Sequence, residues 1–157
     1  MSVQLLEQLR TSLPDRYRVE REVGRGGMAT VFLAHDLKHD RDVAIKVLPA
    51  AFVEDHERLQ RFEREAKLLA QLHHPHIASI FGLEESEGVR ALVMELVEGP
   101  TLADRLESGS LSLEESLSIA RQIAEALEQA HEKGVVHRDL KPQNIKASTE
   151  GKVKVLD

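Results

Sequence analysis

The sequence has no cysteine among its 157 residues, so it offers neither a disulfide framework nor a thiol nucleophile, and its redox compartment cannot be inferred. It also has no run of about 18 apolar residues, the length that crosses a bilayer as a helix. Residues 1–7 lack the basic start and long apolar core of a secretory signal. We therefore expect no membrane segment in this chain and a cytoplasmic location. A membrane anchor downstream of residue 157 stays an open alternative.

An excess of basic residues is absent as well. Lys and Arg total 21 against 27 Asp and Glu, which gives a net charge of −6. This balance disfavours the basic surface that nucleic-acid binding needs. A nucleotide site remains compatible with it, because backbone N–H groups, one lysine and metal ions can hold phosphates locally. With 41% apolar and 31% charged residues, the chain is typical of a globular domain.

The N-terminal residues predict a helix followed by strands. Leucines at near-helical spacing over residues 2–13, closed by Pro14, indicate a short amphipathic helix, and a frayed extension is the alternative. Residues 17–23 then alternate in polarity, and residues 30–34 and 43–48 are short apolar runs. We expect three successive antiparallel strands here, with a polar turn over residues 36–42.

Residues 24–29, GRGGMA, join the first two of these strands. Their glycines permit positive φ and let the backbone approach a ligand closely. A dinucleotide-binding loop would lead into a helix, whereas a β-branched strand follows here, so that interpretation fails. On the third strand, Lys46 needs a partner if it is buried.

A helix is expected over residues 55–72, where apolar residues form one stripe, and the partner of Lys46 should lie on it. His73, His74 and His76 surround Pro75 without a nearby acidic or thiolate ligand, so a loop that ends the helix is a better interpretation than a metal site. Residues 77–83 and 89–95 complete a set of five antiparallel strands. Residues 96–100 end in Gly-Pro and predict a crossing segment.

Two further helices are expected, over residues 101–107 and 113–133. Ser112 and Glu115 predict a capping box for the second, and Gly134 predicts its end. A small hairpin over residues 145–147 and 152–156 should follow. The side chains that we expect to be buried on the second helix are Leu113, Leu117, Ala120, Ile123, Ala124, Leu127 and Ala130.

Between that helix and the hairpin lies the sequence VVHRDLKPQN, residues 135–144. It places Asp139, Lys141 and Asn144 in one short loop, and Pro142 keeps the preceding lysine extended. A carboxylate for a hydroxyl proton, an ammonium for a phosphate and a carboxamide for a metal together suit phosphoryl transfer. The alternative is a buried polar turn between a helix and a strand.

This loop resembles the H-R-D-L-x-x-x-N catalytic loop of protein kinases, and its lysine is similar to that of the Ser/Thr-specific branch. Residues 24–31 resemble the family's glycine-rich loop, although Ala29 stands where the third glycine is usual. Residues 43–46, VAIK, and residues 153–157, VKVLD, resemble two further kinase motifs, the second being the approach to D-F-G. Over about residues 16–157, the chain thus resembles a eukaryotic-like (Hanks-type) bacterial serine/threonine protein kinase.

The resemblance implies an α+β, protein-kinase-like fold, with a five-stranded antiparallel N-lobe carrying one helix and the first part of a mainly helical C-lobe. Residues 1–15 would be an N-terminal helical extension, residues 16–96 the N-lobe, and residues 97–157 the hinge and a partial C-lobe. The implied function is transfer of the ATP γ-phosphate to Ser/Thr hydroxyls of proteins. Because the sequence stops before the Phe of D-F-G, we expect this fragment to be inactive. The alternative function is that of a binding module or a non-functional fragment.

The resemblance also implies roles for single residues. Asp139 would orient or deprotonate the acceptor hydroxyl, Lys141 would stabilise the transferring phosphoryl group, and Asn144 with Asp157 would hold Mg²⁺. Lys46 would bind the α- and β-phosphates. The residues implied for ATP binding are Val23, Gly24, Gly26, Gly27, Val31, Ala44, Lys46, Glu65, Met94, Glu95 and Val97.

Three details of this assignment concern side-chain direction and assembly. Glu65 would face inward and fix Lys46, whereas Glu63 would face out. Lys146 stands where the adenine floor usually has an apolar residue, so only its methylene stem could serve there. A dimer through the N-lobe stays open.

Overall fold

The computed structural model describes residues 2–26, 29–49, 53–86, 88–137, 140–148 and 150–156. The chain forms two compact units, the first with residues 1–70 and 80–96 and the second with residues 71–79 and 97–157. We predicted residues 71–79 in the first lobe, whereas this segment is grouped with the second compact unit. The segment belongs to the second unit because Ile77 forms a parallel bridge with Val155, and the Ala78 N–H donates to the Val155 carbonyl at 3.0 Å.

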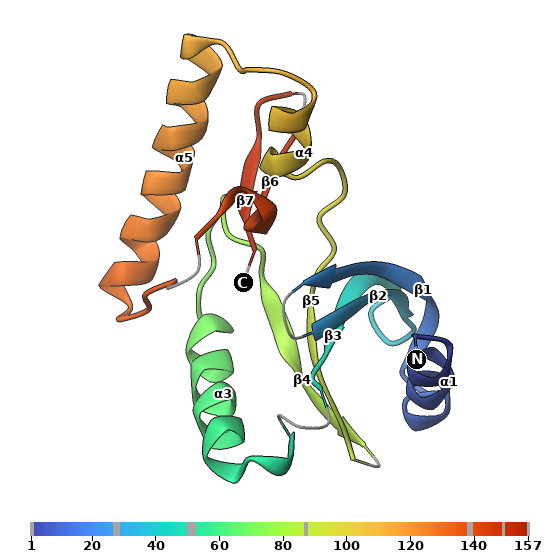
Figure 1. Ribbon diagram of the computed structural model, residues 1–157. Helices are drawn as coiled ribbons and strands as arrows, with labels where there is room; N and C mark the ends of the chain where they lie inside the picture. The colour runs from blue at the N-terminus through green and yellow to red at the C-terminus, as the bar shows by residue number, and fades with distance from the viewer. Residues whose placement is uncertain are drawn as a thin grey trace. The chain divides into compact units, whose positions relative to one another are not determined.

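The first unit contains the expected sheet of five strands (Figure 1), in the order β1-β2-β3-β5-β4. Every pair of neighbouring strands is antiparallel. The fourth strand begins at residue 80, three residues later than expected, because Ile77 and Ala78 bond to Val155 within the second unit. The strands are β1 (Tyr17–Gly26), β2 (Ala29–Asp36), β3 (Arg41–Val47), β4 (Ile80–Ser86) and β5 (Val89–Glu95).

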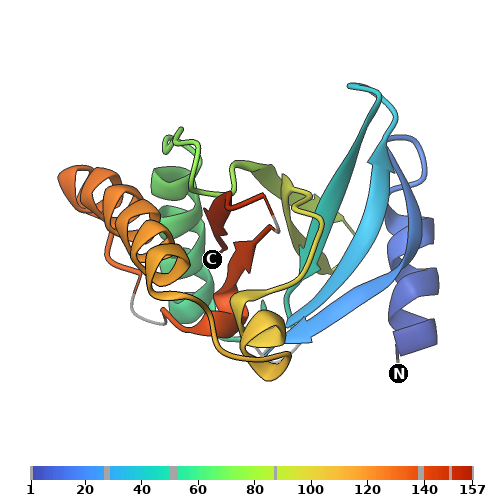
Figure 2. The ribbon, with the colours of Figure 1, turned by 90° about the horizontal axis from the view of Figure 1, so that it is seen from above.

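The N-terminal helix α1 (Ser2–Ser12) covers one face of this sheet, which we call the outer face (Figure 2). Leu9 is fully buried there in a cluster with Phe32 and Ile45. The Arg10 guanidinium donates to the carbonyls of Val19, at 3.0 Å, and Glu20, at 2.9 Å. The helical interpretation of residues 2–13 is therefore confirmed over the frayed alternative.

Helix α3 (His56–Leu69) lies on the opposite, inner face of the sheet (Figure 2). Its first turn is capped by Asp55, whose carboxylate accepts from the Arg58 N–H at 3.2 Å. Its apolar stripe includes buried Ala66 and half-buried Phe62 and Leu69, which pack against the inner face. The helix ends three residues earlier than expected.

The second unit combines helices with a short hairpin. Its elements are α4 (Leu102–Glu107), α5 (Leu113–Glu132), the 3₁₀ turn η1 (Pro142–Asn144), β6 (Ile145–Ala147) and β7 (Val153–Val155). The hairpin packs on α5 through Ile119, Ile145 and Val153. None of the helices within the described ranges is long and apolar enough to cross a membrane.

The expected buried stripe of α5 is largely wrong. Leu113 and Leu117 are 76% and 62% exposed, and Ala120 and Ala124 are also exposed. The side chains that are buried are Ile119, Gln122, Ala126 and Ala130. Only Ala130 belongs to both sets, and half-buried Ile123 packs beside the hairpin. The helix has two apolar stripes, and its contact with the β6–β7 hairpin selects the one that includes a glutamine.

The β2–β3 turn is stabilised by a histidine between two carboxylates. His35 Nδ1 lies 2.9 Å from Asp42 Oδ1, and His35 Nε2 lies 2.9 Å from Asp40 Oδ1. Asp40 has φ of 50°, a left-handed conformation that is uncommon for a residue with a side chain. Carboxylates only accept, so the protonated imidazole can donate to both of them, one from each nitrogen.

We predict that replacing Leu9 destabilises the sheet of the first unit. Leu9→Ala should lower the free energy of unfolding by about 3 kcal/mol, since it leaves a cavity under α1. Val3→Ala on the same helix, where the side chain is 70% exposed, should change it by less than about 0.5 kcal/mol. Urea denaturation measures both, and equal effects would contradict the docking of α1.

A second prediction concerns pH. The hydrogen bonds that His35 donates to Asp42 and then to Asp40 raise the pKa of His35, so its folded-state pKa lies above its unfolded-state pKa. Its contribution to stability is therefore complete below the unfolded-state pKa and is lost as pH rises through the folded-state pKa. An NMR titration of the imidazole should show a lower pKa in Asp42→Asn than in the wild type. Arg18, the cross-strand neighbour of His35 on β1, is present in both proteins, so it does not account for a difference between the two pKa values.

Candidate functional site

The glycine hairpin lies at the end of β1 and β2. Gly24 pairs with Val31 and Gly26 pairs with Ala29, while Gly27 lies outside the described residues. A Cβ atom added to Gly24 would meet no atom of the described chain within 4 Å, and its φ is not among the positive values. Packing within the fold therefore does not require glycine at this position, and a ligand that approaches the backbone would account for it.

Three of the expected nucleotide-binding residues meet on the inner face of the sheet. Val31, Ala44 and Met94 contribute to one apolar cluster, in which Ala44 and Met94 are buried. Ala44 and Met94 are also direct cross-strand partners. Val23, by contrast, is 42% exposed on β1. Val31, the cross-strand partner of Gly24, therefore connects this apolar cluster to the glycine hairpin.

Lys46 lies on the same face as Ala44, because alternate residues of a strand share one face. It pairs with Val31 on one side and Leu92 on the other, and it is half-buried. Its ammonium is thus presented beside the apolar cluster on the strand next to the glycine hairpin.

The glutamates of α3 differ from expectation. We expected Glu63 to face outward, but its half-buried carboxylate forms an ion pair with Arg90 of β5. Glu65, expected to face inward, is exposed, although Ala66 beside it is buried. The outward orientation predicted for Glu63 is therefore wrong, because Glu63 joins Ala66 in the contacts of α3 with the sheet. The inward orientation of Glu65 and its ion pair with Lys46 stay predictions.

The segment after β5 carries the last two residues expected at the adenine. Glu95 closes β5 in the first unit and is half-buried, and Val97 is half-buried at the start of the second unit. Both adopt positions along an extended chain segment, and their roles stay predictions.

The candidate catalytic loop is described on both sides of residues 138 and 139, so Asp139 lies outside the described residues. Lys141 is exposed and extended, with φ of −156° and ψ of 160°, which confirms the conformation expected before Pro142. The Asn144 N–H donates to the Lys141 carbonyl at 2.9 Å and closes the η1 turn. A compact turn therefore places Lys141 and Asn144 at its two ends.

Leu156 connects this loop to the end of the chain. Its N–H donates to the Asn144 carbonyl at 2.8 Å, and its carbonyl accepts from His137 Nε2 at 2.9 Å. Because a carbonyl only accepts, His137 carries its proton on Nε2. Asp157 lies outside the described residues, but its neighbour Leu156 is held by the Asn144 carbonyl and by the His137 side chain, on the two sides of the loop.

Sequence analysis missed Gln122, which holds the hairpin beside this loop. Its side chain is buried, Nε2 donates to the Gly151 carbonyl at 2.8 Å, and Oε1 accepts from the Val153 N–H at 3.1 Å. Ser118 one turn earlier accepts from the same Nε2. The signal available in the sequence was the glutamine's spacing from Ile119 and Ala126, which puts all three on one helix face.

Two further sets of polar contacts lie at the start of α5 and in the histidine segment, residues 73–76. The Ser112 hydroxyl accepts from the Glu115 N–H at 3.1 Å, as expected for a cap. The Glu115 carboxylate pairs with Arg105 of α4, which also donates to the Ser148 carbonyl. His76 of the histidine segment uses Nδ1 to bond the Val153 carbonyl at 2.9 Å.

The sheet with its glycine hairpin and Lys46, followed by helices and a loop containing Lys141 and Asn144, defines the class of protein kinases. The family model for the protein kinase domain matches residues 17–157. This chain belongs to that family. The α+β, kinase-like fold expected from the sequence is thereby confirmed.

Among its relatives, the chain is 45% identical over 143 residues to the serine/threonine-protein kinase PrkC of Bacillus subtilis, covering 90% of the chain and 22% of PrkC. It is 45% identical over 152 residues to the serine/threonine-protein kinase PknA of Mycobacterium tuberculosis, covering 93% of the chain and 35% of PknA. The crystal structure of the Mycobacterium tuberculosis PknI kinase domain matches with a TM-score of 0.81 and 31% identity, covering 91% of this chain and 59% of that one. The chain thus spans only part of each relative.

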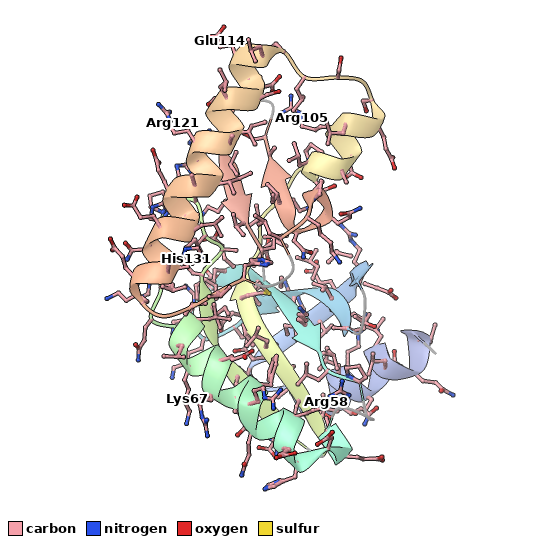
Figure 3. All side chains as sticks on the ribbon, turned by 60° about the vertical axis from the view of Figure 1, so that its left-hand side comes forward. Arg58, Lys67, Arg105, Glu114, Arg121 and His131 are labelled. Carbon is pink, nitrogen blue, oxygen red and sulfur yellow. The ribbon has the colours of Figure 1, made fainter. Side chains whose placement is uncertain are left out.

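We predict that Gln122 is required for the stability of the second unit. Gln122→Met keeps the volume but leaves the Val153 N–H and the Gly151 carbonyl without this partner, which should cost about 2 kcal/mol. Arg121→Met is the matched control on the neighbouring residue, whose side chain is 73% exposed and points away from the helix (Figure 3). Urea unfolding followed by circular dichroism measures both, and a neutral Gln122→Met would contradict the prediction.

Proposed function

We propose that the protein transfers the γ-phosphate of ATP, with Mg²⁺, to serine or threonine hydroxyls of protein substrates. The observation that carries this proposal is the bonding of Leu156 between Asn144 and His137. It brings the backbone of Asn144 next to the residue that precedes Asp157. A carboxamide and a carboxylate presented from these adjoining positions suit a hard cation such as Mg²⁺.

The chemistry of the loop follows from its residue types. Asp139 would accept the proton of the acceptor hydroxyl or orient it, and Lys141 would neutralise charge on the transferring phosphoryl group. Mg²⁺ would supply charge stabilisation for the phosphate oxygens, with Asn144 and Asp157 as its protein ligands. The extended backbone of Lys141 and the closed η1 turn support a fixed spacing of Lys141 and Asn144.

The ATP contacts in this proposal are assigned to single residues. Gly24, Gly26 and Gly27 would approach the phosphates, and Lys46 would pair with the α- and β-phosphates with Glu65 as its partner. Val23, Val31 and Ala44 would contact adenine, and Met94 would line the back of the adenine pocket. Glu95 and Val97 would offer backbone groups to adenine for hydrogen bonding. The shared apolar cluster of Val31, Ala44 and Met94 supports this assignment.

Substrates and assembly are proposals as well. The serine/threonine-protein kinase names of PrkC and PknA support serine and threonine as acceptors. A dimer through the N-lobe belongs to the proposal, and it would use surfaces other than the outer sheet face that α1 covers.

We predict that Lys46→Met and Asp139→Asn each reduce phosphate transfer to background in the complete protein encoded by the gene. The first change removes phosphate positioning and the second removes hydroxyl orientation, each a contribution of several kcal/mol to the barrier, roughly 10³-fold or more in rate. The assay is transfer from radiolabelled ATP to a Ser/Thr protein substrate. Arg121→Ala on the exposed face of α5 serves as the control and should retain activity (Figure 3). Near-wild-type turnover by either site variant, in a preparation free of other kinases, would refute the assignment.

A further inference from the structure

Lys146 makes a contact that the sequence did not indicate. It is the middle residue of β6, and its Nζ donates to the Gly99 carbonyl at 2.8 Å. The sequence suggested only an apolar role for its methylene stem. In the structure, the ammonium is directed to the backbone of the segment that follows β5.

Backbone contacts support the same connection. The Ala147 N–H donates to the Pro100 carbonyl at 3.3 Å, and Thr101 forms an antiparallel bridge with Lys146. Pro100 and Thr101 therefore lie alongside β6. Gly99 has φ of 104°, a left-handed conformation that a residue with a side chain would rarely adopt. The position of the Gly99 carbonyl thus depends on a turn that only glycine makes without strain.

A nearby carboxylate provides a second charge. Asp104 accepts from the Thr101 N–H at 2.9 Å, and the Thr101 hydroxyl in turn accepts from the Asp104 N–H at 3.0 Å. The Thr101 N–H, then the Thr101 side chain, and to a smaller extent the charge of Lys146 hold the pKa of the Asp104 carboxyl below its usual range. The Lys146 ammonium therefore has a carbonyl acceptor and a neighbouring anion on the same segment.

The two segments that Lys146 joins carry different parts of the proposed site. Residues 97–101 are where the chain enters the second unit, and they begin with Val97. Strand β6 follows directly on the η1 turn that ends at Asn144. One side chain thus links the backbone near Val97 to the strand that extends from the catalytic loop.

We propose that Lys146 is a positioning residue for nucleotide binding, whose ammonium fixes the backbone of residues 97–101 against β6 so that Val97 is held ready for the adenine of ATP. This inference rests on the proposed function, since the role of Val97 comes from it. The Lys146 ammonium then strengthens nucleotide binding. A lysine in place of the usual apolar residue under the adenine would by itself suggest weaker binding.

The first test measures, without nucleotide, the contact of Lys146 and β6 with residues 99–101, which we call the clamp. Lys146→Met keeps an unbranched stem but removes the ammonium, so the amides of Thr101 and Ala147 should exchange with deuterium about fivefold faster, the effect expected for one charge-assisted hydrogen bond. Lys152→Met, at an exposed lysine of the same hairpin, is the matched control and should leave these rates unchanged. Unchanged exchange in Lys146→Met would overturn the inference.

The second test measures binding and turnover in the complete protein encoded by the gene. Lys146→Met should raise the Kd of Mg-ADP and the KM for ATP about five- to tenfold, while kcat at saturating ATP changes by less than about twofold. Lys146→Arg, which keeps a donor, should recover part of the affinity. Equal or tighter binding by Lys146→Met overturns the inference alone. A wild-type protein that binds no Mg-ADP overturns the proposed function and this inference together, even where the exchange rates show that the clamp forms.

Discussion

The buried amide of Gln122 is the interaction on which the second unit depends. It donates to the Gly151 carbonyl and accepts from the Val153 N–H, so one side chain of α5 binds the β6–β7 hairpin at its turn and at the start of β7. Strands of three residues are too short to be stable as an isolated hairpin. The η1 turn, the bonds to Leu156 and the contact of Lys146 with Gly99 all extend from this hairpin. A buried polar group with every partner in place specifies one arrangement more strictly than apolar contact does.

The two faces of the sheet in the first unit serve different purposes. On the outer face, α1 buries Leu9 and seals the apolar cluster, with Arg10 bonded to the backbone of β1. The inner face carries α3, whose Phe62, Ala66 and Leu69 pack in the same apolar cluster as Val31, Ala44 and Met94. Lys46 adds a positive charge on this face, which would suit a phosphate group of the proposed nucleotide. The outer face thus has a structural role, and we propose that the inner face combines support of α3 with nucleotide binding.

Local patterns were sufficient for much of this fold. Alternation and short apolar runs located all five strands, and Pro142 predicted the extended Lys141, because these features depend on near neighbours. Long-range contacts decided the rest. Helix α5 has two apolar stripes, and nothing local shows that the stripe with Gln122 is buried. The sequence did not show that Glu63 contacts the sheet, because its partner Arg90 lies on a distant strand. The contact of Lys146 with Gly99 joins residues 47 positions apart, so no local pattern could reveal it.

The most direct test of the central claim is a map of amide hydrogen exchange across the complete protein, with and without a non-hydrolysable ATP analogue and Mg²⁺. The account predicts slower exchange in residues 24–31, 44–46, 95–101 and 141–146 when the nucleotide is present. Exchange in α1 and in the β2–β3 turn around His35 should not change. Protection confined to the outer face of the sheet, or no protection anywhere, would contradict the account.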